Sequence, residues 1–120
     1  MTVHGREVTF KKTVGAACAI EKLFDAAGGA EAFFGGSYAN QQTNAAAFME
    51  ELSKGAEEAA FWEARNRGEQ YQLKLLTASE ALTLGNDEFN ALCAEALAVW
   101  RADLPQVKAE EGKKTENPLS

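Results

Sequence analysis

The sequence predicts a mainly α-helical fold, in which a small helical domain begins with one β-hairpin packed on the helices and ends in a disordered tail. Apolar residues recur at helical spacing over most of the chain, and both prolines lie near its C-terminal end. Strand-like alternation is confined to the first positions. A chain of 120 residues is expected to form one domain, which we place at residues 1–104, followed by the tail at residues 105–120.

The hairpin is predicted at about residues 1–12, with His4 and Gly5 as its two-residue loop. Glycine at the second loop position favours a primed turn, and histidine tolerates the left-handed backbone region better than most residues. Pairing Val3 with Arg6 places the apolar residues of both strands on one face: Met1, Val3, Val8 and Phe10. Because an isolated hairpin is only marginally stable in water, we expect this face to pack on helices.

The first helix is expected to follow an N-cap at Thr13 and to end near Ala27, before the pair Gly28-Gly29. Its apolar stripe consists of Ala16, Ile20, Leu23, Phe24 and Ala27. A short turn that carries Phe33 and Phe34 and a loop with the sequence GGSYANQQ come next.

The longest helix is expected to begin at Thr43 or Asn44 and to reach Asn66. Its seam toward another helix consists of Phe48, Leu52, Gly55, Ala59 and Trp62. Glycine in a helix interior costs about 1 kcal/mol relative to alanine, so Gly55 marks either a break or a close approach of another helix. Five acidic residues of this helix are expected to be solvated: Glu50, Glu51, Glu57, Glu58 and Glu63.

Thr77 and Glu80 have the spacing of a capping box, which predicts a short helix to about Leu84. Asn86 or Asp87 is expected to cap the last helix, whose apolar stripe consists of Phe89, Leu92, Cys93, Ala96, Leu97, Trp100 and Leu104. The following PQVKAEEGKKTENPLS has no aromatic residue and few apolar ones, so it cannot offset the entropy of ordering and is predicted to be disordered.

Composition excludes several classes of function. A net charge of −6 argues against nucleic-acid binding, which normally uses a basic surface. No apolar run approaches the roughly 20 residues that span a bilayer, so we expect no membrane partner and a cytoplasmic location. Cys18 and Cys93 are expected to be small buried hydrophobic residues without a disulfide in the reducing cytosol, and His4 is the only histidine. We therefore expect no metal site.

The sequence contains no pattern typical of an enzyme. No serine has a histidine partner at a suggestive spacing, and GGAEAFFGG lacks both a Walker lysine and the dinucleotide-binding spacing. We expect no catalytic residue and no cofactor. Phe61 and Trp62 are adjacent on one helix and diverge by about 100°, so one of them should reach the edge of the core or a partner. The candidate partner-binding residues are Val8, Phe10, Phe33, Phe34, Phe61 and Trp62.

Two stretches resemble the tail assembly chaperones of long-tailed bacteriophages and related prophages. HGREVTFKKTVGAACAIEKLF matches the family's strand–turn–strand–helix start through Gly5, Arg6, Glu7, Phe10, Gly15, Ile20, Glu21 and Leu23. LTASEALTLGNDEFNALCAEALAVW matches its C-terminal motifs through Leu76, Thr77, Glu80, Ala81, Glu88, Phe89, Leu92 and Leu97. The central stretch from GGSYANQQ to SKG departs from the family pattern, with a longer loop.

This resemblance implies a non-enzymatic assembly factor in the cytoplasm of the bacterial host. Such a factor binds the tape-measure protein and helps to recruit tail-tube subunits during tail morphogenesis. A second hypothesis, which composition fits equally well, is a small acidic helical module of the regulatory or immunity type that masks one partner. We also hypothesise that the outer edges of the hairpin accept another strand or join copies into a homo-oligomer.

Overall fold

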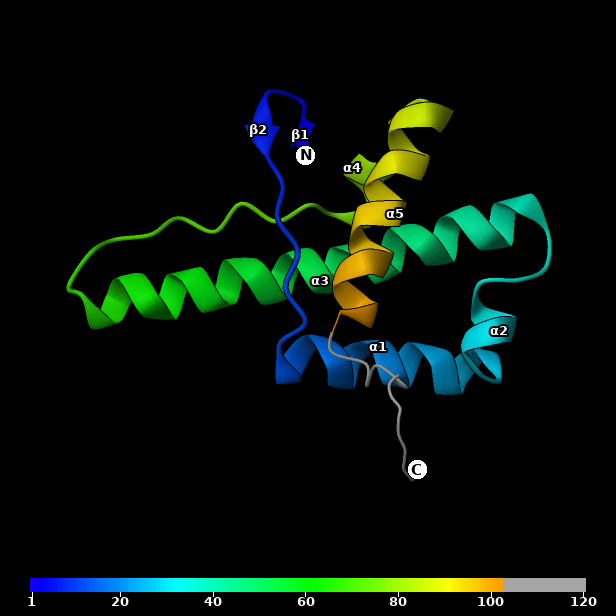
Figure 1. Cartoon of the computed structure of the whole chain (residues 1–120), viewed down its shortest axis with the longest axis horizontal. Coiled ribbons are helices and arrows are strands. Elements are labelled where there is room, and N and C mark those ends of the chain that lie inside the picture. Colours follow the sequence, from blue (N-terminus) through cyan, green and yellow to red (C-terminus); the bar gives the residue numbers. More distant parts are fainter. Residues whose placement is uncertain (103–120) are drawn as a thin grey trace, which may run out of the picture.

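The computed structural model describes residues 1–102 (Figure 1). Its elements are β1 (Thr2–Val3), β2 (Arg6–Glu7), α1 (Val14–Ala27), α2 (Ala30–Phe33), α3 (Tyr38–Asn66), α4 (Ala78–Ala81) and α5 (Asn86–Arg101). The mainly helical class and the N-terminal antiparallel hairpin are therefore confirmed. Leu104 and the predicted disordered tail at residues 105–120 lie outside the described residues.

The hairpin has the predicted register, with Val3 opposite Arg6. His4 and Gly5 both have positive φ angles, 49° and 82°, as a primed two-residue turn requires. The Val8 amide donates to the Met1 carbonyl at 2.9 Å and extends the pairing by one step. Val3 and Val8 are buried in the core, and Met1 and Phe10 pack against it, so the predicted apolar face is confirmed.

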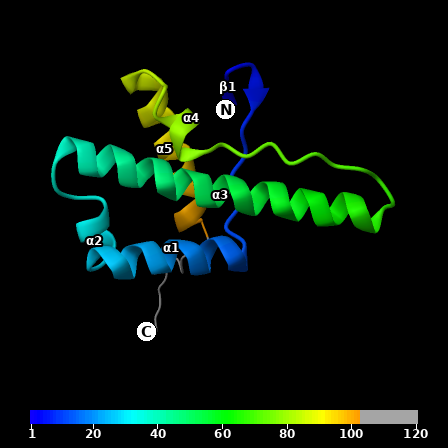
Figure 2. The same ribbon diagram turned by 180° about the vertical axis from the view of Figure 1, so that it is seen from behind.

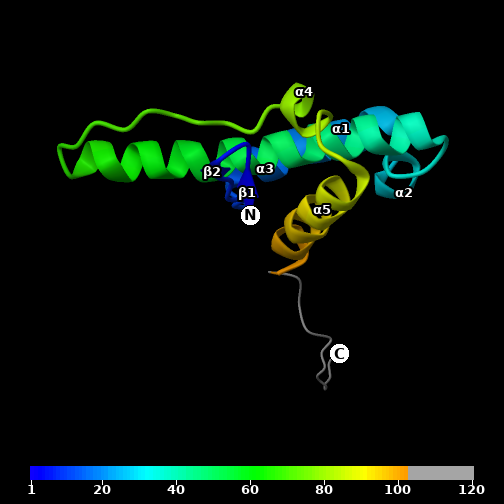
Figure 3. The same cartoon turned by 90° about the horizontal axis from the view of Figure 1, so that it is seen from above.

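The long helix α3 is the central element, and the other segments lie around it. Figures 1 and 2 show α1 along one side of α3, with the hairpin and α4 on the opposite side. The short α2 packs at the end of α1, and α5 crosses α3 steeply; Figure 3 shows α5 and α4 on different sides of α3. The core between these elements is formed mainly by Ile20, Phe33, Phe48, Met49, Leu52, Leu76 and Leu92.

Three predicted helix ends agree closely with the structure. The Thr13 hydroxyl accepts from the amide of Ala16, and Gly28 ends α1 with a left-handed φ of 94°. Thr77 caps α4 in the same way by accepting from the amide of Glu80. The Glu80 carboxylate, however, binds Arg6 rather than closing the capping box.

Gly55 does not mark a break, and the element that approaches it most closely is an extended chain and not the expected helix. Residues 8–13, which join the hairpin to α1, cross α3 at this glycine, and the Lys11 amide donates to the Leu52 carbonyl at 3.0 Å. A Cβ at position 55 would lie only 2.5 Å from the Lys11 carbonyl oxygen. The α3 helix continues unbroken through the crossing. The glycine therefore provides the space in which the extended chain contacts the helix backbone.

Several helix boundaries differ from the predictions. The helix α3 begins at Tyr38, not at Thr43 or Asn44, because the Ser37 hydroxyl accepts the Asn40 amide and caps the helix earlier. Most of the predicted loop is thus helical. Helix α4 stops at Ala81, short of the predicted Leu84, and Gly85 is the N-cap residue of α5, where Asn86 or Asp87 was expected.

Some predicted environments are also wrong. Glu57 is only 8% exposed, because its carboxylate accepts from the Tyr71 hydroxyl and the Lys74 amide, both at 2.9 Å. Glu50 likewise accepts from the Ala78 amide. Cys18 is exposed and only Cys93 is half-buried. Two of the predicted apolar stripes end earlier than expected, because their last residues, Ala27 of α1 and Trp62 of α3, are exposed.

Candidate protein-binding site

The six candidate binding residues lie in three separate regions. Val8 and Phe33 are each only 3% exposed, so their side chains belong to the core. Phe10 and Phe34 are half-buried at the hairpin and beside α2. Phe61 is half-buried near the end of α3, where its neighbour Trp62 is 57% exposed.

Phe34 belongs to a cluster of five aromatic rings where α1, α2, α3 and α5 meet. The rings contact one another edge to face, with centroids 5.0–5.8 Å apart: Phe24, Phe33, Phe34, Phe48 and Trp100. This geometry is the favourable one for aromatic quadrupoles. The Lys12 ammonium lies 4.1 Å from the centre of the Trp100 ring and donates to the Trp100 carbonyl. The cluster is therefore held in place from several elements.

One side of this cluster opens to the surface as a hollow of about 550 Å³, which we call the aromatic cleft. Its apolar wall is formed by Phe24, Phe34, Leu97 and Trp100, all half-buried. Exposed residues of α2 and α5 complete it: Ala30, Glu31 and Arg101. An apolar wall bordered by one acidic and one basic residue suits an amphipathic segment of another protein.

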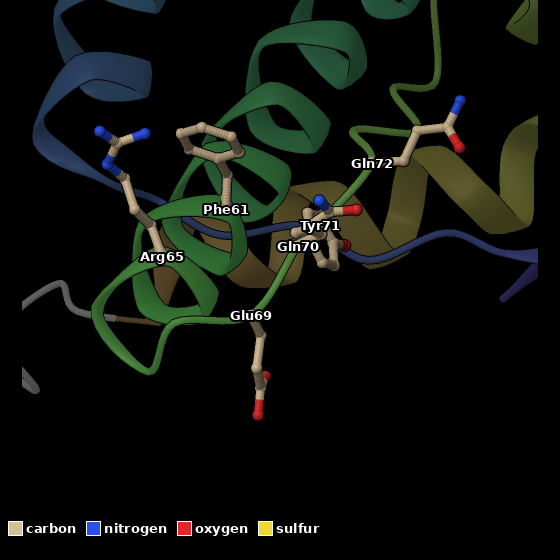
Figure 4. A pocket seen from close by; sticks show the side chains of 6 residues that line it. All are labelled: Phe61, Arg65, Glu69, Gln70, Tyr71 and Gln72. Carbon is tan, nitrogen blue, oxygen red and sulfur yellow. The ribbon is translucent and has the colours of Figure 1, made fainter.

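A second hollow, of about 580 Å³, lies at the far end of α3 (Figure 4). Phe61 and Arg65 point to one side of the helix, whereas Glu69 points away from them. The Arg65 guanidinium instead lies 5.6 Å from the centre of the Trp62 ring. The polar groups do not converge on one point, so this region is an exposed surface with aromatic side chains.

The most perturbed carboxylate ties the hairpin to α4. Glu80 accepts two hydrogen bonds of 2.6 Å from the Arg6 guanidinium, and its Oε2 lies 2.8 Å from His4 Nδ1. The hydrogen bonds from Arg6 have the largest effect and the contact with His4 the next, and together they lower the pKa of Glu80 to about 2. The carboxylate is therefore ionised at neutral pH, and both of its oxygens are occupied by Arg6 and His4. It fixes the hairpin in position and offers no proton for acid–base chemistry.

Among residues 1–102 no cluster of histidine, cysteine and acidic residues has the arrangement of a metal site. No helix in this range is both long and apolar enough to cross a membrane. Of the residues that line the aromatic cleft, sequence reasoning marked only Phe34 for binding. Phe24, Leu97 and Trp100 were assigned to the core, because helical periodicity shows that a side chain points inward but not whether another element covers it.

Comparisons with protein-family models, curated proteins and solved structures found no significant match.

Proposed function

We propose that this protein is a non-enzymatic tail assembly chaperone, which binds the tape-measure protein and helps to recruit tail-tube subunits in the cytoplasm of the bacterial host. The resemblance of the two sequence stretches supports this role. The observation that carries the proposal is the aromatic cleft, a preformed apolar surface on an otherwise acidic protein.

The cleft has the properties needed to hold apolar helices of a client. Burying apolar surface is worth about 25 cal/mol per Å², and a wall already ordered by ring contacts needs little further ordering on binding. Glu31 and Arg101 would orient a client segment that carries charges of both signs. The net charge of −6 would keep the loaded complex soluble.

Co-expression with a tape-measure protein encoded beside this chain tests the proposal. Ala30 is exposed at the cleft and is the first residue of α2, where a glutamate suits the helix N-terminus. Ala30→Glu should therefore fold normally, partly fill the cleft and lower the soluble yield of the tape-measure protein. Ala32→Glu is the matched control, because Ala32 is exposed on the same helix and does not line the cleft.

A tape-measure protein that is equally insoluble with and without this chain would refute the chaperone role. If Ala30→Glu gives the same soluble yield of the tape-measure protein as the parent, the aromatic cleft is not the site that binds it. Purification of the chain with a toxin or a transcription factor would favour a regulatory or immunity-type module instead.

A further inference from the structure

The segment between α3 and α4, residues 67–77, returns along α3, as Figures 1 and 2 show; we call it the connecting segment. Side chains of α3 accept hydrogen bonds of 2.6–2.9 Å from alternate amides at the end of this segment and the start of α4: Glu57 from Lys74, Ser53 from Leu76 and Glu50 from Ala78. The acceptors follow the spacing of one helix face, and the donors follow the two-residue period of an extended chain. One edge of the segment is thus paired with a helix.

The spacing of these hydrogen bonds agrees with an extended backbone. From Glu50 to Glu57 the helix rises about 10.5 Å at 1.5 Å per residue. From Lys74 to Ala78 an extended chain spans about 13 Å at 3.3 Å per residue. The two lengths match within the reach of the side chains. The connecting segment is therefore held in an extended conformation, although it pairs with no strand among the described residues.

The alternation directs the amides of Leu73 and Leu75 to the opposite edge. Neither amide donates a hydrogen bond to another group within residues 1–102. The Leu75 carbonyl on this edge accepts from Arg6 at 2.8 Å. Two large side chains beside the edge are exposed, Tyr71 by 38% and Leu73 by 43%. Figures 1 and 3 show no other described element along the outer side of the segment near the end of α3.

We propose that Tyr71–Leu75 is a docking site for an extended segment of a partner protein, which adds to this edge as a β-strand. The amides of Leu73 and Leu75, unpaired and two residues apart, recognise an extended backbone beside the carbonyl that Arg6 already occupies. Tyr71 and Leu73 favour apolar side chains at alternate positions of the partner. Anchoring by Glu57 and Ser53 has already ordered the edge, so binding costs little conformational entropy. This site is separate from the aromatic cleft and does not depend on the function proposed above.

The test uses the full chain and twelve-residue peptides selected from a random displayed library against it. Amide hydrogen exchange followed by NMR reads out the binding mode. A selected peptide should slow exchange at Leu73 and Leu75 and leave Lys74 and Leu76, which are already bonded, unchanged. This alternating protection is specific to strand addition, since a peptide seated only on side chains does not produce it.

Two proline variants provide a second readout. Leu73→Pro removes one outward amide and should weaken peptide binding by about tenfold, the equivalent of about 1.4 kcal/mol. Gln72→Pro is the matched control, because the amide that it removes, that of Gln72, points toward α3 and not to the outer edge. The affinity of this variant for the peptide should remain near that of the parent. Circular dichroism checks that both variants are folded.

Three results would overturn the proposal. The first is that no peptide is recovered, and the second is that the peptides bind Leu73→Pro as tightly as the parent. The third is protection without alternation, together with loss of binding in Ala30→Glu, which would assign the peptides to the aromatic cleft.

Discussion

Replacing Gly55 by alanine tests the close crossing of residues 8–13 over α3. The new Cβ would lie 2.5 Å from the Lys11 carbonyl oxygen, 3.0 Å from Thr13 Oγ1 and 3.1 Å from the Ala16 Cβ. The first of these atoms belongs to the backbone and cannot rotate away. The crossing chain must therefore move outward, which also weakens the hydrogen bond from the Lys11 amide to α3.

Opposing effects determine the size of the change. Overpacking costs about 1–3 kcal/mol, and a weakened hydrogen bond adds about 0.5–1.5 kcal/mol. Replacing glycine by alanine inside a helix returns about 1 kcal/mol. We therefore expect Gly55→Ala to lower the free energy of unfolding by about 2 kcal/mol, which lowers Tm by roughly 10 °C for a domain of this size.

Urea unfolding followed by circular dichroism at 222 nm measures this change. Gly15→Ala is the matched control, because Gly15 also lies in a helix but a Cβ there meets only Thr13 Oγ1, at 4.0 Å. That variant should gain up to about 1 kcal/mol. If Gly55→Ala is as stable as the parent, the crossing is not packed as described.

Three further predictions concern polar and thiol groups. Because the pKa of Glu80 is lowered to about 2, its ion pair with Arg6 stabilises the fold above about pH 4.5, and this stabilisation is lost as the pH falls toward 2. In an acid titration, the free energy of unfolding of Glu80→Gln should therefore fall less steeply with decreasing pH than that of the parent. Ser53→Ala leaves a buried amide of the connecting segment unpaired and should lower the free energy of unfolding by about 1–3 kcal/mol in urea titrations. Ellman's reagent should label exposed Cys18 before Cys93, whose pKa is raised by burial, and Cys18→Ser should remove the fast phase.

The sequence predicts the fold well where one local rule decides the outcome. The loop chemistry of His4-Gly5 determines the hairpin register, and Thr13 with Gly28 determines both ends of α1. It fails where two local rules compete. The glycine pair and polar residues before Thr43 favour a loop, but Ser37 caps a helix there, and packing of the following turns on the core extends α3.

The candidate sites were harder to predict, because they depend on contacts between distant segments. Glutamates at the spacing of positions 50 and 57 normally face solvent, and nothing local shows that the connecting segment returns to cover them. The aromatic cleft likewise requires Trp100 of α5 to meet Phe24 of α1 at 5.8 Å. Helical periodicity identified Phe24 and Trp100 as inward-facing, but it could not show that their packing leaves one side of the aromatic cluster open to the surface.

The placement of the hairpin also affects how the chain can fold during synthesis. Arg6 binds Glu80, 74 positions later, and Lys12 contacts Trp100, 88 positions later. A ribosome that adds about 5–20 residues per second needs roughly 4–15 s to bridge the first of these intervals. The hairpin therefore lacks these contacts until the later residues have been synthesised. A chain that ends before α5 also lacks the Trp100 ring that packs on Phe24 and Phe48, which leaves these two side chains more accessible to quality-control proteases.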